Sequence, residues 1–145
     1  MMQIRHCLTI AMMLLPALSY AMPQVCAPNI CLDVDIAVTA LEQKRGLQGR
    51  EGLNPNQGML FVFAQDDRSP FWMKDMKFPL DIIWMDAQGH IVFIGDHLPP
   101  CIKDPCAVYT PKTQARYVLE VQAGFADAQK WHVGDALKIK GVLGQ

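Results

Sequence analysis

The residues best suited to bind a ligand include a short aromatic and cationic segment, Phe71-Trp72-Met73-Lys74. In a strand, Phe71 and Met73 face one way while Trp72 and Lys74 face the other. If the first pair packs in the core, the second forms an exposed surface suited to a sugar ring, a peptide or an acidic ligand. The alternative is that Trp72 packs under a loop and Lys74 is only a solvated end.

Arg50 lies in a glycine-bearing loop, and Asp81 interrupts an otherwise apolar strand pattern. A guanidinium group matches a carboxylate or phosphate group well, and a carboxylate near a core is rarely left without a partner. We therefore expect Asp81 to orient Arg50, and both to form one binding patch with Trp72 and Lys74. The alternative is that Arg50 and Asp81 only hold the loop in place, with no ligand.

The sequence gives little support for a catalytic residue. After residue 21 the chain holds one serine, Ser69, and it contains no Gly-x-Ser-x-Gly motif, which argues against a serine hydrolase. Glycoside cleavage needs paired carboxylates, and no spacing singles out two of the several present. We predict no catalytic residues, and we keep a hydrolase that uses Asp or Glu groups as the alternative.

Cysteine spacing predicts disulfides. After residue 21 the chain holds two pairs, Cys26 with Cys31 and Cys101 with Cys106. An even number in an exported chain indicates disulfides, and three connectivities are possible. We favour the two local bridges, because Pro28-Asn29 and Asp104-Pro105 are turn residues that can bring the ends together. A four-cysteine zinc site has a permitted spacing but is disfavoured in an oxidising compartment.

No metal or cofactor is expected. His90 and His97 could converge with Asp96 as metal ligands, but isolated histidines in turns are usually only solvated. The glycines near Arg50 do not precede a helix with Lys-Ser or Lys-Thr, so they do not form a phosphate-binding loop. The net charge of −1 gives no electrostatic case for a nucleic-acid partner.

The N-terminal segment Met1–Ala21 predicts a secretory signal peptide. Arg5 and His6 precede an apolar stretch from Cys7 to Tyr20, and small residues flank the expected cleavage position after Ala21. The stretch is short for a membrane span, which needs about 20 apolar residues. We therefore expect a periplasmic or secreted domain of residues 22–145 with no membrane span after cleavage; an uncleaved anchor is the alternative.

Hydrophobic patterning predicts a mainly β, single-domain sandwich or distorted barrel with two short helices. A capping box at Thr39-x-x-Glu42 predicts a helix that Gly46 ends, and a second helix is expected over Phe125–Trp131. Expected strands cover residues 32–38, 59–63, 80–85, 91–94, 117–121 and 136–139. We expect loops over Gln65–Pro70 and over the proline-rich segment Gly95–Lys112.

Several ordered motifs together resemble a known family. They are Gly46-Leu47-x-x-Arg50, Gly58-Met59-Leu60-Phe61-Val62-Phe63, Phe71-Trp72-Met73-Lys74, Pro79-Leu80-Asp81-Ile82-Ile83, Asp86 to Gly89-x-Ile91-Val92, Ala115-Arg116-Tyr117-Val118-Leu119-Glu120-Val121-x-Ala123-Gly124 and Gly134-Asp135. This series resembles the DUF192 family, also called UPF0127. The resemblance implies a compact, mainly β domain, commonly exported, with no known activity. The chain departs from the family at Gln48, where Met is frequent, and at Asp75-Met76, where Asn-Thr is frequent.

These observations lead to one functional hypothesis. We predict an exported cell-envelope accessory or binding module, DUF192-like, whose partner is an envelope ligand or protein that the sequence does not identify. We expect it to act as a monomer. The alternative is an envelope hydrolase that acts on saccharide or peptide.

Overall fold

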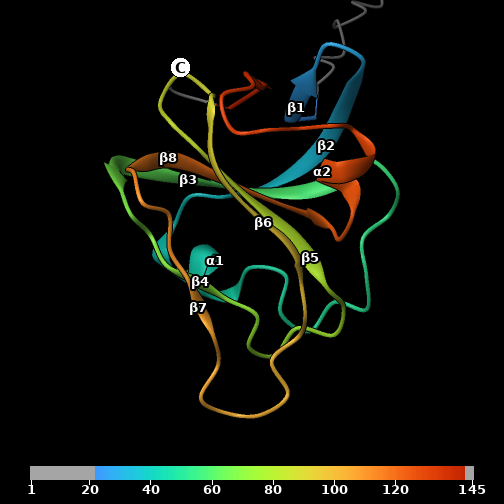
Figure 1. Cartoon of the computed structure of the whole chain (residues 1–145), viewed down its shortest axis with the longest axis vertical. Coiled ribbons are helices and arrows are strands. Elements are labelled where there is room, and N and C mark those ends of the chain that lie inside the picture. Colours follow the sequence, from blue (N-terminus) through green and yellow to red (C-terminus); the bar gives the residue numbers. More distant parts are fainter. Residues whose placement is uncertain (1–21, 143–145) are drawn as a thin grey trace, which may run out of the picture.

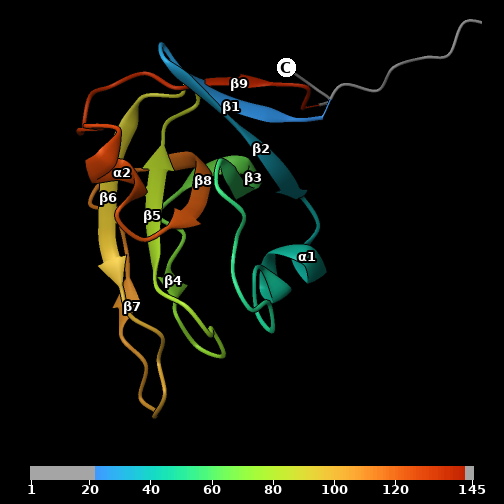
Figure 2. The ribbon, with the colours of Figure 1, turned by 90° about the vertical axis from the view of Figure 1, so that its right-hand side faces the viewer.

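The computed structural model describes residues 22–142, so the predicted signal peptide at Met1–Ala21 lies outside the described residues. The fold is mainly β: a curled seven-stranded sheet forms a half-barrel, with a separate two-stranded ribbon and two short helices (Figures 1 and 2). This confirms the predicted fold class. No helix in the described segment is long and apolar enough to cross a membrane.

The elements follow one another in a simple order. They are β1 (Gln24–Ala27), β2 (Ile30–Ala37), α1 (Ala40–Arg45), β3 (Gln57–Asp67), β4 (Phe71–Trp72), β5 (Leu80–Met85), β6 (Ile91–Leu98), β7 (Val108–Tyr109), β8 (Ala115–Gln122), α2 (Phe125–Ala128) and β9 (Lys138–Lys140). The large sheet has the order β6-β5-β8-β3-β2-β1-β9, and β4 pairs with β7 in the ribbon. Only the β2–β3 pair is parallel among these strand pairs.

Each face of the large sheet carries its own hydrophobic core. All six residues of β5 are buried, because β6 and β8 flank this strand and both of its faces are covered. Ile83 and Leu119 belong to the core that includes Ala126 of α2, which we call the α2-side core. Ile82 and Val118 belong to the core that includes Leu47, directly after α1, which we call the α1-side core. Successive residues of a strand point to opposite faces, so Ile82 and Ile83 enter different cores, as do Val118 and Leu119.

Helix α1 forms as the sequence predicts. The Thr39 Oγ1 accepts a hydrogen bond from the Glu42 backbone N–H at 3.3 Å, and the Glu42 carboxylate accepts one from the Thr39 N–H at 2.8 Å. Gly46, with a φ of +49°, ends the helix and donates to the Glu42 carbonyl. The Gln43 side chain donates to the Val62 carbonyl at 3.0 Å. The helix is thereby attached to β3, beside the α1-side core.

The half-barrel is held partly closed by a contact between its two ends. His90, in the turn before β6, forms an isolated β-bridge with Ala136, which precedes β9. The Leu137 N–H donates to the Gly89 carbonyl at 2.9 Å. A Cβ on Gly89 would lie 2.3 Å from the Leu137 carbonyl oxygen, and Gly89 has a φ of +86°. Glycine is therefore required for this close approach of two backbone segments.

Two loop predictions need correction. Gln65–Pro70 was expected to be a loop, but β3 continues to Asp67, which pairs with Ala115 after a register shift. The side chains at this end of the strand are polar and exposed, so the sequence lacks the apolar pattern of a strand, although the backbone still pairs. The segment Gly95–Lys112 was expected to be a peripheral loop, yet the edge strand β6 extends to Leu98 and β7 pairs with β4 in the ribbon. The segment between β6 and β7 projects from the large sheet at the lower end of Figure 2.

Both predicted local disulfides are confirmed. Cys26 and Cys31 are directly paired across the β1–β2 hairpin and are bonded to each other. Cys101 and Cys106 close the loop between β6 and β7. Because all four sulfur atoms are engaged in disulfides, the alternative of a four-cysteine zinc site is wrong.

Asp81 does not orient Arg50, so that prediction is wrong. The Asp81 side chain is fully buried, and its Oδ1 accepts hydrogen bonds from the backbone N–H groups of His97 at 2.8 Å and Gly124 at 3.0 Å. Its Oδ2 accepts another from the Ala126 N–H at 2.9 Å. These backbone donors satisfy the carboxylate and attach the start of α2 and the end of β6 to β5. Asp81 is therefore a structural residue on the α2 side of the sheet.

We expect Asp81→Asn to lower the free energy of unfolding by about 3 kcal/mol, because an amide offers one acceptor oxygen where the carboxylate satisfies donors on both. Urea denaturation followed by circular dichroism measures the change. Asp96→Asn, at an exposed position on β6, is the matched control and should change stability by less than about 0.5 kcal/mol. Equal small effects of the two substitutions would contradict the structural role of Asp81.

Candidate functional site

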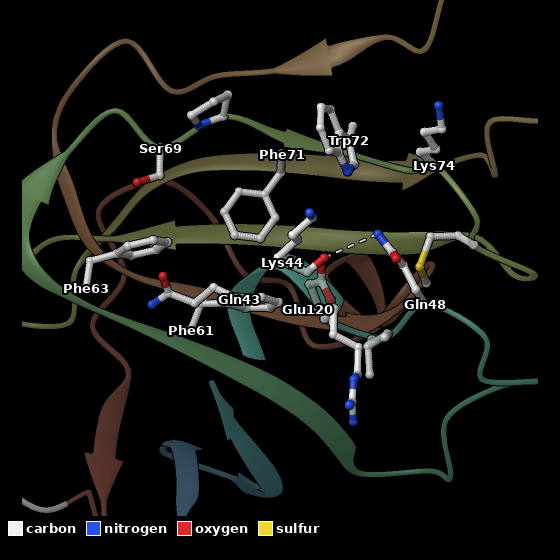
Figure 3. A pocket seen from close by; sticks show the side chains of 15 residues that line it. Gln43, Lys44, Gln48, Phe61, Phe63, Ser69, Phe71, Trp72, Lys74 and Glu120 are labelled. Carbon is white, nitrogen blue, oxygen red and sulfur yellow. Dashed lines mark hydrogen bonds between the residues drawn. The ribbon is translucent and has the colours of Figure 1, made fainter. Parts of the chain in front are cut away.

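The strongest candidate site is a cavity of about 300 Å³ on the α1 side of the sheet, between α1, β3 and the segment around β4 (Figure 3). Three kinds of side chain give it chemical character. They are the aromatic wall of Phe61, Phe63, Phe71 and Trp72, the basic rim of Lys44, Arg45 and Lys74, and a single acid, Glu120. The cavity therefore combines apolar surface with a few charged groups, the usual composition of a small-molecule site.

The aromatic wall is held rigidly by the core. The ring of Phe71 meets the ring of Phe61 edge-on, with centroids 4.9 Å apart, and meets the ring of Trp84 in the same way at 5.6 Å. Met73 is buried, whereas Trp72 keeps 53% of its surface exposed. The predicted alternation of this segment is confirmed, and the alternative in which Trp72 packs under a loop is wrong. Trp72 thus stands at the mouth of the cavity.

Glu120 is the unusual group in this cavity. It lies in β8 between Met59 of β3 and Ile82 of β5, and it shares the α1 side with Val118. Only 5% of its surface is exposed, and its Oε2 has no hydrogen-bond partner within residues 22–142. Burial raises the pKa of this carboxyl to about 8, although the nearby Arg50 guanidinium opposes the shift. At neutral pH the carboxyl is therefore mostly protonated.

Gly46 lets the end of α1 lie against this acid. A Cβ added at Gly46 would lie 3.2 Å from Cζ of Phe61 and 3.9 Å from Oε2 of Glu120. Figure 3 shows Glu120 between Phe61 and Gln48 in this view. The glycine thus shapes the wall of the cavity beside Glu120, and its positive φ makes any other residue costly there.

Arg50 lies in a neighbouring hollow and not in the Glu120 cavity. Its Nη1 is 2.8 Å from Oδ2 of Asp35, and both side chains are partly exposed. The two hollows share Arg45, Gly46 and Gln48 as lining residues, so they adjoin at the end of α1. Arg50 influences the site through its charge, as the pKa of Glu120 shows.

Lys74 is held at the cavity by the disulfide-closed loop. Its Nζ donates to both carboxylate oxygens of Asp104, at 3.2 and 2.9 Å, and this hydrogen bond raises the pKa of the Lys74 ammonium group. Lys74 also forms an isolated β-bridge with Cys101. The Cys101–Cys106 bridge therefore helps to position one member of the basic rim.

The structure thus brings together part of the predicted patch. Trp72 and Lys74 line one cavity, Arg50 lies beside it, and Asp81 belongs to the other face of the sheet. Sequence reasoning missed Glu120 as a site residue. Its signal was an acid within the apolar strand segment Tyr117–Val121, on the face shared with Val118.

Residues 22–142 contain two groups of potential metal ligands. One is Cys101, Asp104 and Cys106, but its two cysteines are bonded to each other in a disulfide. In the described part of the chain, Asp96, His97 and Asp127 place ligand atoms within 4.8 Å of one another, and all three are exposed. His90, the other histidine considered as a metal ligand in the sequence, is not in this group; its Nδ1 lies 3.1 Å from Oδ2 of Asp86.

The sequence of the described domain matches a known protein family. Residues 24–139 match the sequence profile of DUF192, described as an uncharacterized ACR. The chain belongs to the DUF192 family. The match covers most of the chain and includes every residue that gives the cavity its character, so the predicted resemblance is confirmed.

Two solved structures resemble this DUF192 protein. One is a putative transcription regulator from Sinorhizobium meliloti 1021, with a TM-score of 0.74 and 28% identity, over 88% of this chain and 100% of that chain. The other is a protein of unknown function from Novosphingobium aromaticivorans DSM 12444, with a TM-score of 0.72 and 25% identity, over 80% of this chain and 82% of that chain. No curated protein matches the chain.

The burial of Glu120 predicts a pH-dependent stability. An unfolded Glu ionises near its ordinary pKa of 4.5, whereas folded Glu120 keeps its proton until about pH 8. The contribution of Glu120 to the free energy of unfolding is therefore complete below pH 4.5. It is lost as the pH rises to 8, by up to about 1.4 kcal/mol for each pH unit. We expect the stability gain of Glu120→Gln over wild type, measured by urea denaturation, to grow between pH 5 and pH 8.

Glu51→Gln is the matched control, since Glu51 is exposed and pairs with Lys77 at the surface. Its difference from wild type should stay nearly constant over the same pH range. A constant difference for Glu120→Gln would show that the folded protein does not hold this carboxyl in its neutral form.

Proposed function

We propose that this DUF192 protein is an exported, non-catalytic binding module of the cell envelope, and that its ligand occupies the Glu120 cavity. The observation that carries the proposal is a buried carboxyl oxygen that has no hydrogen-bond partner among residues 22–142, beside an aromatic wall. Burying a polar group without a partner costs free energy, typically about 1–3 kcal/mol. A ligand that supplies a hydrogen bond to this oxygen recovers the cost, so the cavity is suited to a ligand with a donor group.

Trp72 and Lys74 have the exposure that ligand contact requires. Trp72 offers a large rigid ring at the mouth of the cavity, and Lys74 lies on its rim with its ammonium charge paired by Asp104. Arg50 acts on the site through its charge and contacts Asp35. The proposed binding set is therefore Glu120, Trp72 and Lys74, within walls formed by Phe61 and its neighbours.

An envelope hydrolase has less support. Glycoside cleavage by the usual mechanism needs two carboxyl groups, placed about 5–9.5 Å apart on either side of the bond. Of the described residues that line the cavity, Glu120 alone is acidic. A binding role needs no second acid.

The proposed compartment rests on the N-terminal sequence and the cysteines. Two disulfides fit an oxidising environment, and Met1–Ala21 has the pattern of a signal peptide. The description of the Sinorhizobium meliloti protein as a putative transcription regulator is not extended to this chain. The net charge of the present chain, −1, does not favour nucleic-acid binding.

Export predicts a defined mature N-terminus. We expect the protein isolated from its native host to begin at Met22, because small residues precede that position in the pattern that signal peptidases recognise. N-terminal sequencing of material from fractionated cells measures this. A product that retains Met1 and stays in the cytoplasmic fraction would rule out export.

The cavity predicts where small ligands bind. A library of small aromatic amines, alcohols and carboxylic acids, screened by amide nuclear magnetic resonance, should give hits that shift Gly46, Phe61 and Trp72. Trp72→Ala should weaken those hits at least about tenfold, equivalent to about 1.4 kcal/mol. Val108→Ala, which removes the exposed cross-strand neighbour of Trp72, is the control and should leave them unchanged. Hits scattered over the surface would contradict the proposed site.

A further inference from the structure

We propose that the ligand of this cavity carries a protonated amine or a guanidinium group, which enters between the aromatic side chains and pairs with the carboxylate of Glu120. This inference rests on the proposed binding function and specifies the ligand class.

Glu120 has a buried oxygen that needs a hydrogen-bond donor. Its Oε2 is buried without a partner among residues 22–142, although it lines a cavity that a ligand can enter. A carbonyl group on a ligand can only accept a hydrogen bond from the protonated acid. A cationic donor can instead donate hydrogen bonds to the ionised carboxylate. Hydrogen bonds between two charged partners are about twice as strong as those between neutral ones.

The aromatic wall supports the same class of ligand. Four aromatic side chains, those of Phe61, Phe63, Phe71 and Trp72, line the cavity. Aromatic faces attract cations through their quadrupole, more strongly when the site excludes water. The same apolar surroundings strengthen an ion pair formed at Glu120. A buried acid within aromatic walls is therefore suited to an organic cation.

The neighbouring basic groups do not replace this missing partner. Lys74 is bound by Asp104 at 2.9 Å, and Arg50 is bound by Asp35 at 2.8 Å, so each already has a counter-ion. Lys44 and Arg45 are exposed in the last turn of α1, where cations interact favourably with the helix dipole. None of these groups hydrogen-bonds to Oε2 of Glu120 in the described structure. The counter-ion of Glu120 is left to the ligand.

Binding then requires a proton to leave. Without a ligand, the Glu120 carboxyl is mostly protonated at pH 7, because burial raises its pKa to about 8. When an ammonium group takes its place beside the carboxylate, the O–H bond of the acid breaks and the proton passes to the solvent. The nearby positive charge lowers the pKa of Glu120 and favours this release. Up to one proton is therefore released for each ligand bound.

Isothermal titration calorimetry on the mature protein, with benzylamine, benzyl alcohol and benzoate as probes at pH 7, tests this inference. We expect benzylamine to bind at least tenfold more tightly than either of the others. Repeating the titration in buffers of different ionisation enthalpy should show release of nearly one proton per benzylamine. Glu120→Gln should lower benzylamine affinity at least tenfold and abolish the release. Glu51→Gln, at an exposed ion pair, should change neither quantity.

Benzyl alcohol or benzoate binding in this cavity as tightly as benzylamine would overturn the ligand class, but not the proposed binding function. Benzylamine binding to the wild-type protein without proton release would also overturn it, a result that does not depend on the folding of any variant. Failure of all three probes while library compounds other than amines fill the cavity would overturn the class alone. Failure of every library compound would overturn the binding function as well.

Discussion

Strand β8 is central to the sheet, yet it carries a carboxyl group into a buried environment. Tyr117, Leu119 and Val121 pack into the α2-side core, and Val118 packs into the α1-side core. Glu120 lies on the same side as Val118, so an acid is buried at the edge of the α1-side core. The structure leaves a cavity there, bounded by the end of α1 and by the segment around β4.

The two buried acids of the sheet show how differently a carboxyl group can be accommodated. Asp81 accepts three backbone hydrogen bonds and connects β5 to β6 and α2. Glu120 has an oxygen that no described residue satisfies, and burial raises its pKa. A buried carboxyl group whose hydrogen bonds are satisfied stabilises the fold, whereas one with an unsatisfied oxygen costs free energy. Because the unsatisfied oxygen of Glu120 belongs to a residue that lines a cavity, its cost in folding free energy favours a role in ligand binding over a role in stability.

Local sequence patterns predicted most of the fold but only part of the site. The capping box at Thr39, the alternation at Trp72 and the two local disulfides depend on nearby residues, and each was predicted. The partners of Asp81 are backbone groups far along the chain, so no side-chain pattern reveals them. The site role of Glu120 depends on α1 and β4 packing over β8. The position of Glu120 in an apolar strand therefore marked the residue as unusual, but the sequence could not show that it lines a cavity.

The most direct test of this account is a ¹³C nuclear magnetic resonance titration of the Glu120 side-chain carboxyl, assigned by comparison with Glu120→Gln. The account predicts a pKa near 8 in the free protein, caused by burial, and a lower value when benzylamine saturates the cavity. A pKa near the ordinary value of 4.5, unchanged by benzylamine, would contradict both the unpartnered carboxyl and its proposed role in the site.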